Sequence, residues 1–421
     1  MAHKFYITND LGGGGTNVSR FVDYKQLFDF PGIGLLLNYY YLTGQATPKF
    51  DAKIIREVLK YNQIGDFLNA AKQMFAKTRK VSDYFKQDLN PTNINGYMLD
   101  NGCGNILRDL LTNGAYTIDS IQKIVIPFLD FAETMQFDFS IALDYAMKYT
   151  YKDNENKDKP MKQLWEELAS NERINLSLIE STLNAIKEHK YKQQVYAPLH
   201  GFDYQSFENY LQRIQDAELQ IGTSFNGYAL GGIADSRKLP DNIWNVPNKI
   251  TKELKTGYIV SNLSHTVRKL TDRPLHVLGA GNIYILPFII NAGASSSDCH
   301  SAWRRASDGG YEKAKILIPL LNDKLEFINN RNVLKYVRIR DLDDSYNFDF
   351  GMSIKQLQQL YQTKGEDFYF AEIITFYNAI KQYDLLIRFT NERKNYLNDL
   401  CQTSDHKFNS DYQRLISALN L

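Results

Sequence analysis

The sequence predicts an α/β protein built on a TIM (β/α)8 barrel, with a mainly helical C-terminal extension. Two observations support this fold. Eight short apolar or β-branched runs alternate with segments of helix-like spacing over roughly 310 residues, as expected for parallel strands joined by helical crossovers. Most of these runs end in a polar or glycine-containing cluster, and the C-terminal ends of TIM-barrel strands carry the chemistry. A doubly wound sheet is the alternative.

The predicted strands follow one another along the first three quarters of the chain. They are expected at residues 4–8, 34–41, 96–99, 139–143, 194–199, 227–230, 275–278 and 294–297. The segments with helical spacing between them include residues 54–75, 175–189, 204–219 and 282–292. A charged stretch at 151–162 favours a linker or long loop. We therefore expect a catalytic barrel at residues 1–310 and a helical region at 311–421 that completes and covers it.

Composition limits the classes of function. The chain has 421 residues, 49 Lys+Arg and 48 Asp+Glu, which give a formal net charge of +1. Proteins that bind nucleic acid over their whole surface are usually strongly basic, so any such contact is expected to be a local patch. Three cysteines are too few for a disulfide framework and fit a reducing cytosol. The sequence shows neither a membrane-spanning apolar run nor a secretory signal, so we expect a cytoplasmic protein without a membrane partner.

Carboxylates mark the ends of three predicted strands. Asp100, Asp144 and Asp298 each stand next to such an end. A surface loop would explain one of them, but three at the same end of a barrel indicate a functional site.

Other chemically suggestive features are weak. The glycine run at 12–15 lacks the Lys-Ser/Thr of a P-loop and favours a turn. His276 lies in a predicted strand and favours a structural role. Asp298, Cys299 and His300 are chain neighbours with poor geometry for a metal.

Seven blocks of the chain resemble, in order, motifs of the tRNA-guanine transglycosylase family. FNGYALGGIADSRK at 225–238 resembles G-Y-A-[IV]-G-G-L-A, and RPLHVLGAGN at 273–282 resembles R-P-x-Y-L-M-G-V-G. SSDCHSAWRR at 296–305 is similar to F-D-C-x-x-P-T-R. Further similarities are LLLNYYYLTG, MLDNGCGN, FSIALDYAMKYT and YAPLHGFDY. The family fold is a TIM barrel, and its members replace guanine in a nucleic acid with a 7-deazaguanine through a covalent enzyme–sugar intermediate.

The resemblance implies roles for the three carboxylates. Asp298 matches the nucleophile that attacks the sugar C1′, and Asp100 matches the general acid/base that handles the N9 proton of the base. Asp144 matches the carboxylate that binds the guanine edge. These roles agree with general chemistry, because a carboxylate nucleophile divides displacement at C1′ into two easier steps. A second carboxylate can then take a proton from the incoming base.

The resemblance also implies contacts to the base and to the nucleic-acid backbone. His200 replaces a Gln that contacts the base carbonyl, and Leu278 replaces a Met that packs on the base face. Gly232 matches the glycine whose N–H reaches the carbonyl, with Gly231 beside it. Arg304 matches the Arg of P-T-R and is expected, with Arg305, at the backbone phosphates.

Several positions depart from the family pattern. The zinc ligands of the family are replaced by Phe348, Phe350, Ser353 and Tyr377, so we expect no metal cofactor. Gly104 stands where the family has a base-stacking aromatic residue, and Ala146 and Lys148 replace Cys and Pro after Asp144.

These departures favour the DNA-guanine transglycosylases, which resemble the tRNA enzymes and put bases such as preQ0 or preQ1 into DNA. A tRNA enzyme of the queuosine or archaeosine type is the alternative. A non-catalytic partner subunit and a nucleosidase also remain open. Basic residues favour a polymer substrate, namely Arg237, Lys238, Arg268, Lys269, Arg304 and Arg305. We expect a homodimer or an accessory protein as partner.

Overall fold

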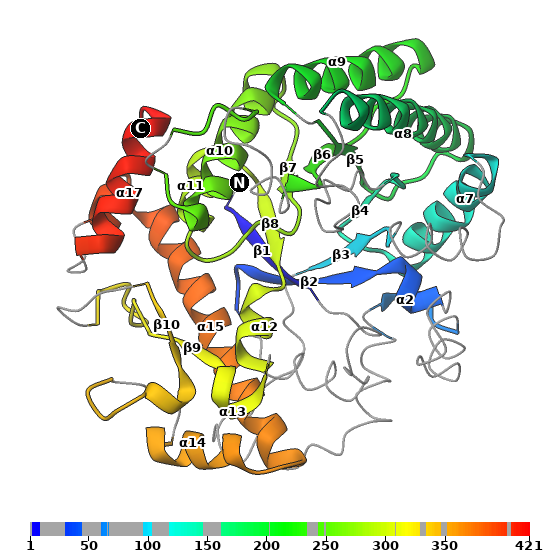
Figure 1. The fold of residues 1–421 in the computed structure, drawn as a ribbon. Helices are drawn as coiled ribbons and strands as arrows, with labels where there is room; N and C mark the ends of the chain where they lie inside the picture. Colours follow the sequence, from blue (N-terminus) through cyan, green and yellow to red (C-terminus); the bar gives the residue numbers. More distant parts are fainter. Residues whose placement is uncertain are drawn as a thin grey trace.

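The computed structural model describes residues 2–8, 30–43, 60–64, 66, 96–102, 118–145, 161–201, 203–233, 243–247, 250–307, 309–328, 334–346, 352–401 and 406–421. Eight parallel strands form a closed barrel in chain order (Figure 1). They are β1 (Lys4–Thr8), β2 (Ile33–Asn38), β3 (Tyr97–Asp100), β4 (Phe139–Ile141), β5 (Val195–Leu199), β6 (Gly227–Leu230), β7 (Leu275–Val277) and β8 (Ser296–Cys299). The predicted TIM-barrel fold is confirmed.

Several strand boundaries differ from the sequence prediction by one to three residues, including those of β2 and β8. β2 ends at Asn38, and Tyr39–Thr43 form the short helix α2 instead of continuing the strand to residue 41. β8 begins two residues later than expected and includes Asp298, because Tyr6 of β1 pairs with Asp298 in the register of the two strands. The nucleophile candidate therefore lies within the closed barrel and not in the loop after it.

Helices surround the barrel, as Figure 1 shows. They include α7 (Ile118–Met135), α8 (Met161–His189), α9 (Tyr204–Ile221), α10 (Lys252–Leu270) and α11 (Leu286–Asn291). The ends of α9 follow local rules: Asp203 and Ser206 form a capping box, and Gly222 ends the helix at φ 74°. The helix expected at 54–75 falls mostly outside the described residues, as do the 12–15 glycine run and most of the 151–162 stretch.

Aromatic and aliphatic side chains fill the barrel interior beneath the strand ends. The buried set is Tyr6, Leu36, Met98, Phe139, Ile141, Tyr196 and Ala229, with Leu278 packed against it. Phe139 and Tyr196 stack with their ring centroids 4.2 Å apart. Gly34 makes room for Tyr6, because a Cβ there would lie 2.7 Å from the ring. This packed layer is a floor on which the polar side chains of the strand ends rest.

A small antiparallel sheet follows the barrel, which the sequence did not predict. After α12 (Ser301–Ser307) and α13 (Gly310–Lys313), β9 (Lys315–Leu317) pairs with β10 (Tyr336–Arg338). The remaining elements are η3 (Ile339–Asp341), α14 (Ile354–Gln362), α15 (Glu366–Glu392), α16 (Tyr396–Cys401) and α17 (His406–Leu419). α15 contacts β1, α11, α12 and β9. The division of the chain at residue 310 stays a prediction.

Among the described helices, none has the length and apolar character needed to cross a membrane.

Candidate active site

Three carboxylates lie at the C-terminal ends of the barrel strands. Asp100 is the last residue of β3, Asp144 follows β4 by three residues, and Asp298 is the third residue of β8. Burial and the negative charges of Asp144 and Asp298 raise the pKa of Asp100 to about 7. The fold thus brings all three predicted carboxylates into one electrostatically coupled group.

Asp298 is held by donors from both neighbouring strands. Its Oδ2 accepts a hydrogen bond from the hydroxyl of Thr8 at 2.9 Å, and its Oδ1 accepts one from the backbone N–H of Gly279 at 2.9 Å. His276 Nε2 lies 3.1 Å from the same Oδ1. With its side chain almost fully buried, Asp298 has a fixed direction at the top of the barrel.

His276 forms a chain of contacts below Asp298. The His276 ring is fully buried, and its Nδ1 lies 2.8 Å from the hydroxyl of Ser296, the residue paired with it in the β7–β8 register. An ionised carboxylate only accepts hydrogen bonds, so Nε2 donates to Asp298 and a neutral ring accepts from Ser296. The sequence interpretation of His276 as structural missed this contact with the candidate nucleophile.

The loop after β7 wraps around Asp298. Gly279 has φ 65°, a conformation that favours glycine and turns its N–H toward the carboxylate. Gly281 donates its N–H to the backbone carbonyl of Asp298 at 2.9 Å, and a Cβ on Gly281 would lie 2.8 Å from Ser297 Oγ. The Gly-Ala-Gly sequence is therefore required by close approach of this loop to β8.

Asp100 accepts a short hydrogen bond from a residue of the neighbouring strand β2. Asn38 pairs with Asp100 in the β2–β3 register and donates from Nδ2 to Oδ2 at 2.7 Å. Gly102, at φ 67°, leaves space for this amide, because a Cβ there would lie 2.4 Å from Asn38 Oδ1. The hydrogen bonds from Asn38 and from the Gly102 backbone lower the pKa of Asp100 but do not outweigh burial and the neighbouring charges.

Asp144 lies between an amide and an imidazole. Asn101 donates from Nδ2 to Asp144 Oδ1 at 2.9 Å, and His200 Nε2 lies 3.0 Å from Asp144 Oδ2. His200 is buried, and neither of its ring nitrogens has a hydrogen bond of good geometry with the described residues. The two side chains expected to read the base edge are thus neighbours, and the imidazole retains hydrogen-bonding capacity.

The remaining base-binding candidates line the same end of the barrel. The backbone N–H of Gly231 donates to the carbonyl of Leu199, whereas Gly232 is exposed and has a φ of 73°. Leu278 is half-buried on the aromatic and aliphatic floor. These positions surround the strand ends that carry the carboxylates.

The predicted basic residues divide between the two ends of the barrel. Arg304 and Arg305 lie on α12, directly after β8. Arg268 instead supports the loops at the opposite end, where it donates to the carbonyls of Gly293 and Arg273, and Lys269 is exposed beside it. Arg237 and Lys238 lie outside the described residues.

Two of the four residues at the family's zinc positions, Ser353 and Tyr377, make other contacts in the structure. Ser353 caps α14 by accepting from the N–H of Gln356 at 3.2 Å, and Tyr377 packs against Phe30 with ring centroids 5.5 Å apart. Phe348 and Phe350 are not among the described residues, nor are Gly104, Ala146 and Lys148. In the described ranges no group of three or more His, Cys, Asp or Glu could hold a metal ion.

No protein-family model matches the chain, and no curated protein matches it. The resemblance to the tRNA-guanine transglycosylases therefore depends on the seven motifs quoted above.

Proposed function

We propose that the protein is a base-exchanging transglycosylase that replaces guanine in a nucleic acid with a 7-deazaguanine such as preQ0 or preQ1. The observation that carries this proposal is the group of three carboxylates, in which Asp298 is fixed by three contacts and Asp100 has a pKa of about 7. A general acid/base works best when its pKa is near the working pH, because it must both give and take a proton. A purely structural carboxylate needs no such environment.

The first step in this mechanism releases guanine. The Asp298 carboxylate forms a bond to C1′ as the C1′–N9 bond breaks, and the departing base takes a proton from Asp100. The protein must first take the target nucleotide out of the stack, because an enzyme cannot reach the reacting atoms of a base inside a duplex. The product is an ester between Asp298 and the sugar.

The second step reverses the proton transfer. The N9–H of the incoming 7-deazaguanine gives its proton to the Asp100 carboxylate, and the nitrogen lone pair forms the new bond to C1′. Asp298 leaves as a carboxylate. Two displacements at the same carbon give net retention of configuration.

Base selection belongs to the Asp144–His200 pair. A carboxylate can accept from the N1–H and N2–H₂ groups of guanine, a donor pattern that adenine lacks. An imidazole N–H of His200 and the backbone N–H of Gly232 can donate to the base carbonyl. Leu278 supplies an apolar surface for the base face.

Isotope exchange tests this function. The wild-type protein is incubated with labelled guanine and either DNA or tRNA, beside the Asp298→Asn variant. We expect incorporation into one polymer, with DNA favoured because of the departures from the tRNA enzymes, and a loss of at least about a thousandfold in the variant. Asp138→Asn, at the opposite end of the barrel, is the control and should keep full activity. Absence of label in both polymers with the wild-type protein would overturn the proposal.

A further inference from the structure

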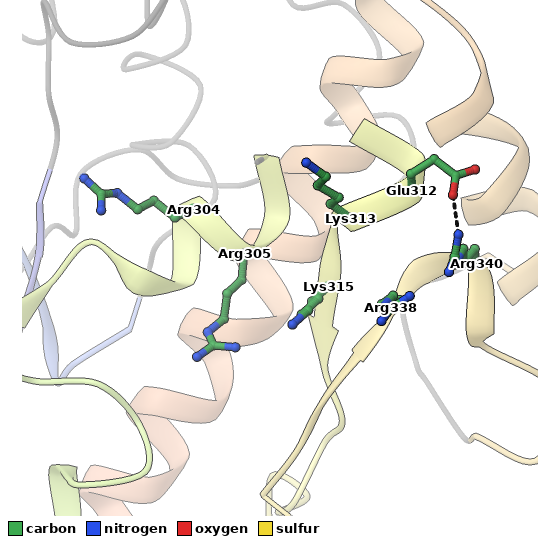
Figure 2. A pocket seen from close by; sticks show the side chains of 7 residues that line it. All are labelled: Arg304, Arg305, Glu312, Lys313, Lys315, Arg338 and Arg340. Atoms are coloured by element: carbon green, nitrogen blue, oxygen red, sulfur yellow. Dashed lines mark hydrogen bonds and ion pairs between the residues drawn. The ribbon is translucent and has the colours of Figure 1, made fainter. Parts of the chain in front are cut away.

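A strongly basic cleft includes residues of α12, the helix that follows the strand carrying Asp298. It has a volume of about 610 Å³ and is lined by Arg304, Arg305, Glu312, Lys313, Lys315, Arg338 and Arg340. Six of these seven residues are cationic, although the whole chain has a formal net charge of only +1. They come from α12, α13, β9, β10 and η3, and Figure 2 shows their side chains. Positive charge is therefore concentrated at one place on a nearly neutral protein.

Most of this charge is not neutralised by the described part of the protein. Glu312 pairs with Arg340, which also lies 3.4 Å from Asp341, and Arg338 is 4.0 Å from Asp341. No described carboxylate lies within ion-pair distance of the other four cations, which are Arg304, Arg305, Lys313 and Lys315. The exposed pairs that do exist contribute little to stability and are readily exchanged for another anion.

Two of the cations lie opposite each other in the two-stranded β9–β10 sheet. Lys315 of β9 and Arg338 of β10 are register partners in the antiparallel sheet. Like charges directly opposite each other destabilise a sheet. Folding alone gives no reason for this pair, whereas an anion bound between the two side chains would remove the repulsion.

Arg305 is held in place at the same cleft. Its guanidinium carbon lies 4.3 Å from the ring centroid of Tyr336, the residue two before Arg338 on β10. In Figure 2 the Lys315 side chain points toward Arg305, whereas Arg304 extends away from the other cations. A stacked guanidinium loses little freedom on binding and presents planar donors that suit phosphate.

We propose that this cleft binds the phosphate backbone of the nucleic-acid substrate beside the target nucleotide. The inference rests on the proposed function, and it adds Lys313, Lys315, Arg338 and Arg340 to the two arginines expected from the sequence. Continuity supports it: α12 begins two residues after Cys299, so the cleft adjoins the strand that carries Asp298. In this arrangement the target nucleotide reacts at the top of the barrel, and the neighbouring backbone phosphates lie along the β9–β10 sheet.

Salt-dependent binding tests the cleft. Anisotropy titrations of a short guanine-containing single-stranded DNA and of an RNA stem-loop compare the wild-type protein with the Lys315→Gln/Arg338→Gln variant. We expect binding to weaken at least about tenfold, on the scale of a charge-assisted hydrogen bond. The slope of log affinity against log salt should fall by about 0.7 for each lost contact to a single strand.

The Lys190→Gln/Lys192→Gln variant is the matched control. It removes an equal number of charges from two exposed residues that precede β5, at the other end of the barrel. The control should bind like the wild-type protein with an unchanged slope. The cleft variant should also unfold no more easily than the wild type, because it loses a repulsive pair.

The outcomes separate this inference from the proposed function. If the wild-type protein exchanges guanine but the cleft variant binds both polymers like the control, the cleft inference is wrong. A cleft that held only a small anion would give that same result. If polymer binding depends on the cleft but no guanine is exchanged, the cleft is supported and the proposed function is overturned.

Discussion

At the scale of single residues, the charge of one carboxylate depends on its neighbours. The pKa of Asp100 is raised to about 7 first by burial and then by the charges of Asp144 and Asp298. The Asp144→Asn substitution removes one of these charges and keeps the shape of the side chain. We therefore expect the pKa of Asp100 to fall below 7 in this variant, measured by the carboxyl-carbon NMR titration of the free protein. Asp138 pairs with Lys4 below the floor of the barrel, so the Asp138→Asn variant should leave the pKa of Asp100 unchanged.

The same pKa predicts how base exchange depends on pH. Asp100 must be protonated to release guanine and ionised to accept a proton from the incoming base. The rate should therefore be highest near pH 7 and decline on both sides. A rate that does not change with pH on either side of pH 7 would show that Asp100 does not transfer the proton.

His276 acts through Asp298 and is expected to be a positioning residue. The His276→Phe substitution removes the donor to Asp298 Oδ1. We expect kcat for exchange to fall about tenfold to a hundredfold with little change in KM, because a misdirected nucleophile costs rate and not affinity. His276→Gln retains a donor at this place and should recover part of the loss. Equal kcat values for His276→Phe and the wild type would contradict the role.

The sequence located the residues of the site better than their partners. Asp100, Asp144, Asp298 and His200 stand in recognisable blocks at strand ends, and the barrel brings them together. Thr8 carries no motif, and Asn38 stands in one of the seven blocks without an assigned role. Both reach the carboxylates only through strand pairing in the closed barrel. Partners of this kind depend on register, which is not visible in a single strand.

At the scale of elements, α15 is attached to the rest of the protein by buried amide side chains. Gln382 Oε1 accepts from the N–H groups of Leu320 and Leu321 at 2.8 and 3.1 Å, and its Nε2 donates to the Leu321 carbonyl. Asn378 donates to the carbonyl of Leu317, the last residue of β9. These bonds fix the helix against the strand that carries Lys315.

Removing the central amide should destabilise this attachment. Gln382→Leu leaves two buried N–H groups unsatisfied, each at about 1–3 kcal/mol. We expect the free energy of unfolding to fall by about 3 kcal/mol in equilibrium urea denaturation. Gln359→Leu, on the exposed side of α14, is the control and should change it by no more than about 0.5 kcal/mol. A Gln382→Leu midpoint equal to that of the control would rule out this role.

Elements differ in how well the sequence predicts them. Apart from β8, whose sequence is Ser-Ser-Asp-Cys, the barrel strands are largely apolar runs, and all eight lie within a few residues of their predicted places. The β9–β10 sheet was missed because its strands have three residues each and include Lys315 and Arg338, so neither shows an alternating pattern. The cleft was missed with it, since only the pairing of β9 with β10 brings these charges together.

At the scale of the whole molecule, the barrel closes where its first strand meets its last. β1 pairs with β8, and His3, just before β1, is buried at this seam. Its Nδ1 lies 2.8 Å from the carbonyl of Ala294 and its Nε2 lies 2.9 Å from Ser297 Oγ. Burial lowers the pKa of His3 to about 4. The ring is therefore neutral in the native protein at neutral pH, and it donates from Nδ1 while Nε2 accepts from Ser297.

The seam between β1 and β8 should therefore become less stable in acid. The unfolded chain binds a proton on this residue near pH 6.5, whereas the native chain does so only near pH 4, so the unfolded state holds more protons in between. The contribution of His3 to the free energy of unfolding is therefore fully present above pH 6.5 and is lost as the pH falls toward 4. A shift of this size corresponds to about 3 kcal/mol. His3→Gln should remove that part of the acid sensitivity of the urea midpoint, and exposed His265→Gln on α10 should not. If His3→Gln loses stability between neutral pH and pH 4 as steeply as the wild type, a proton on His3 is not what opens the seam.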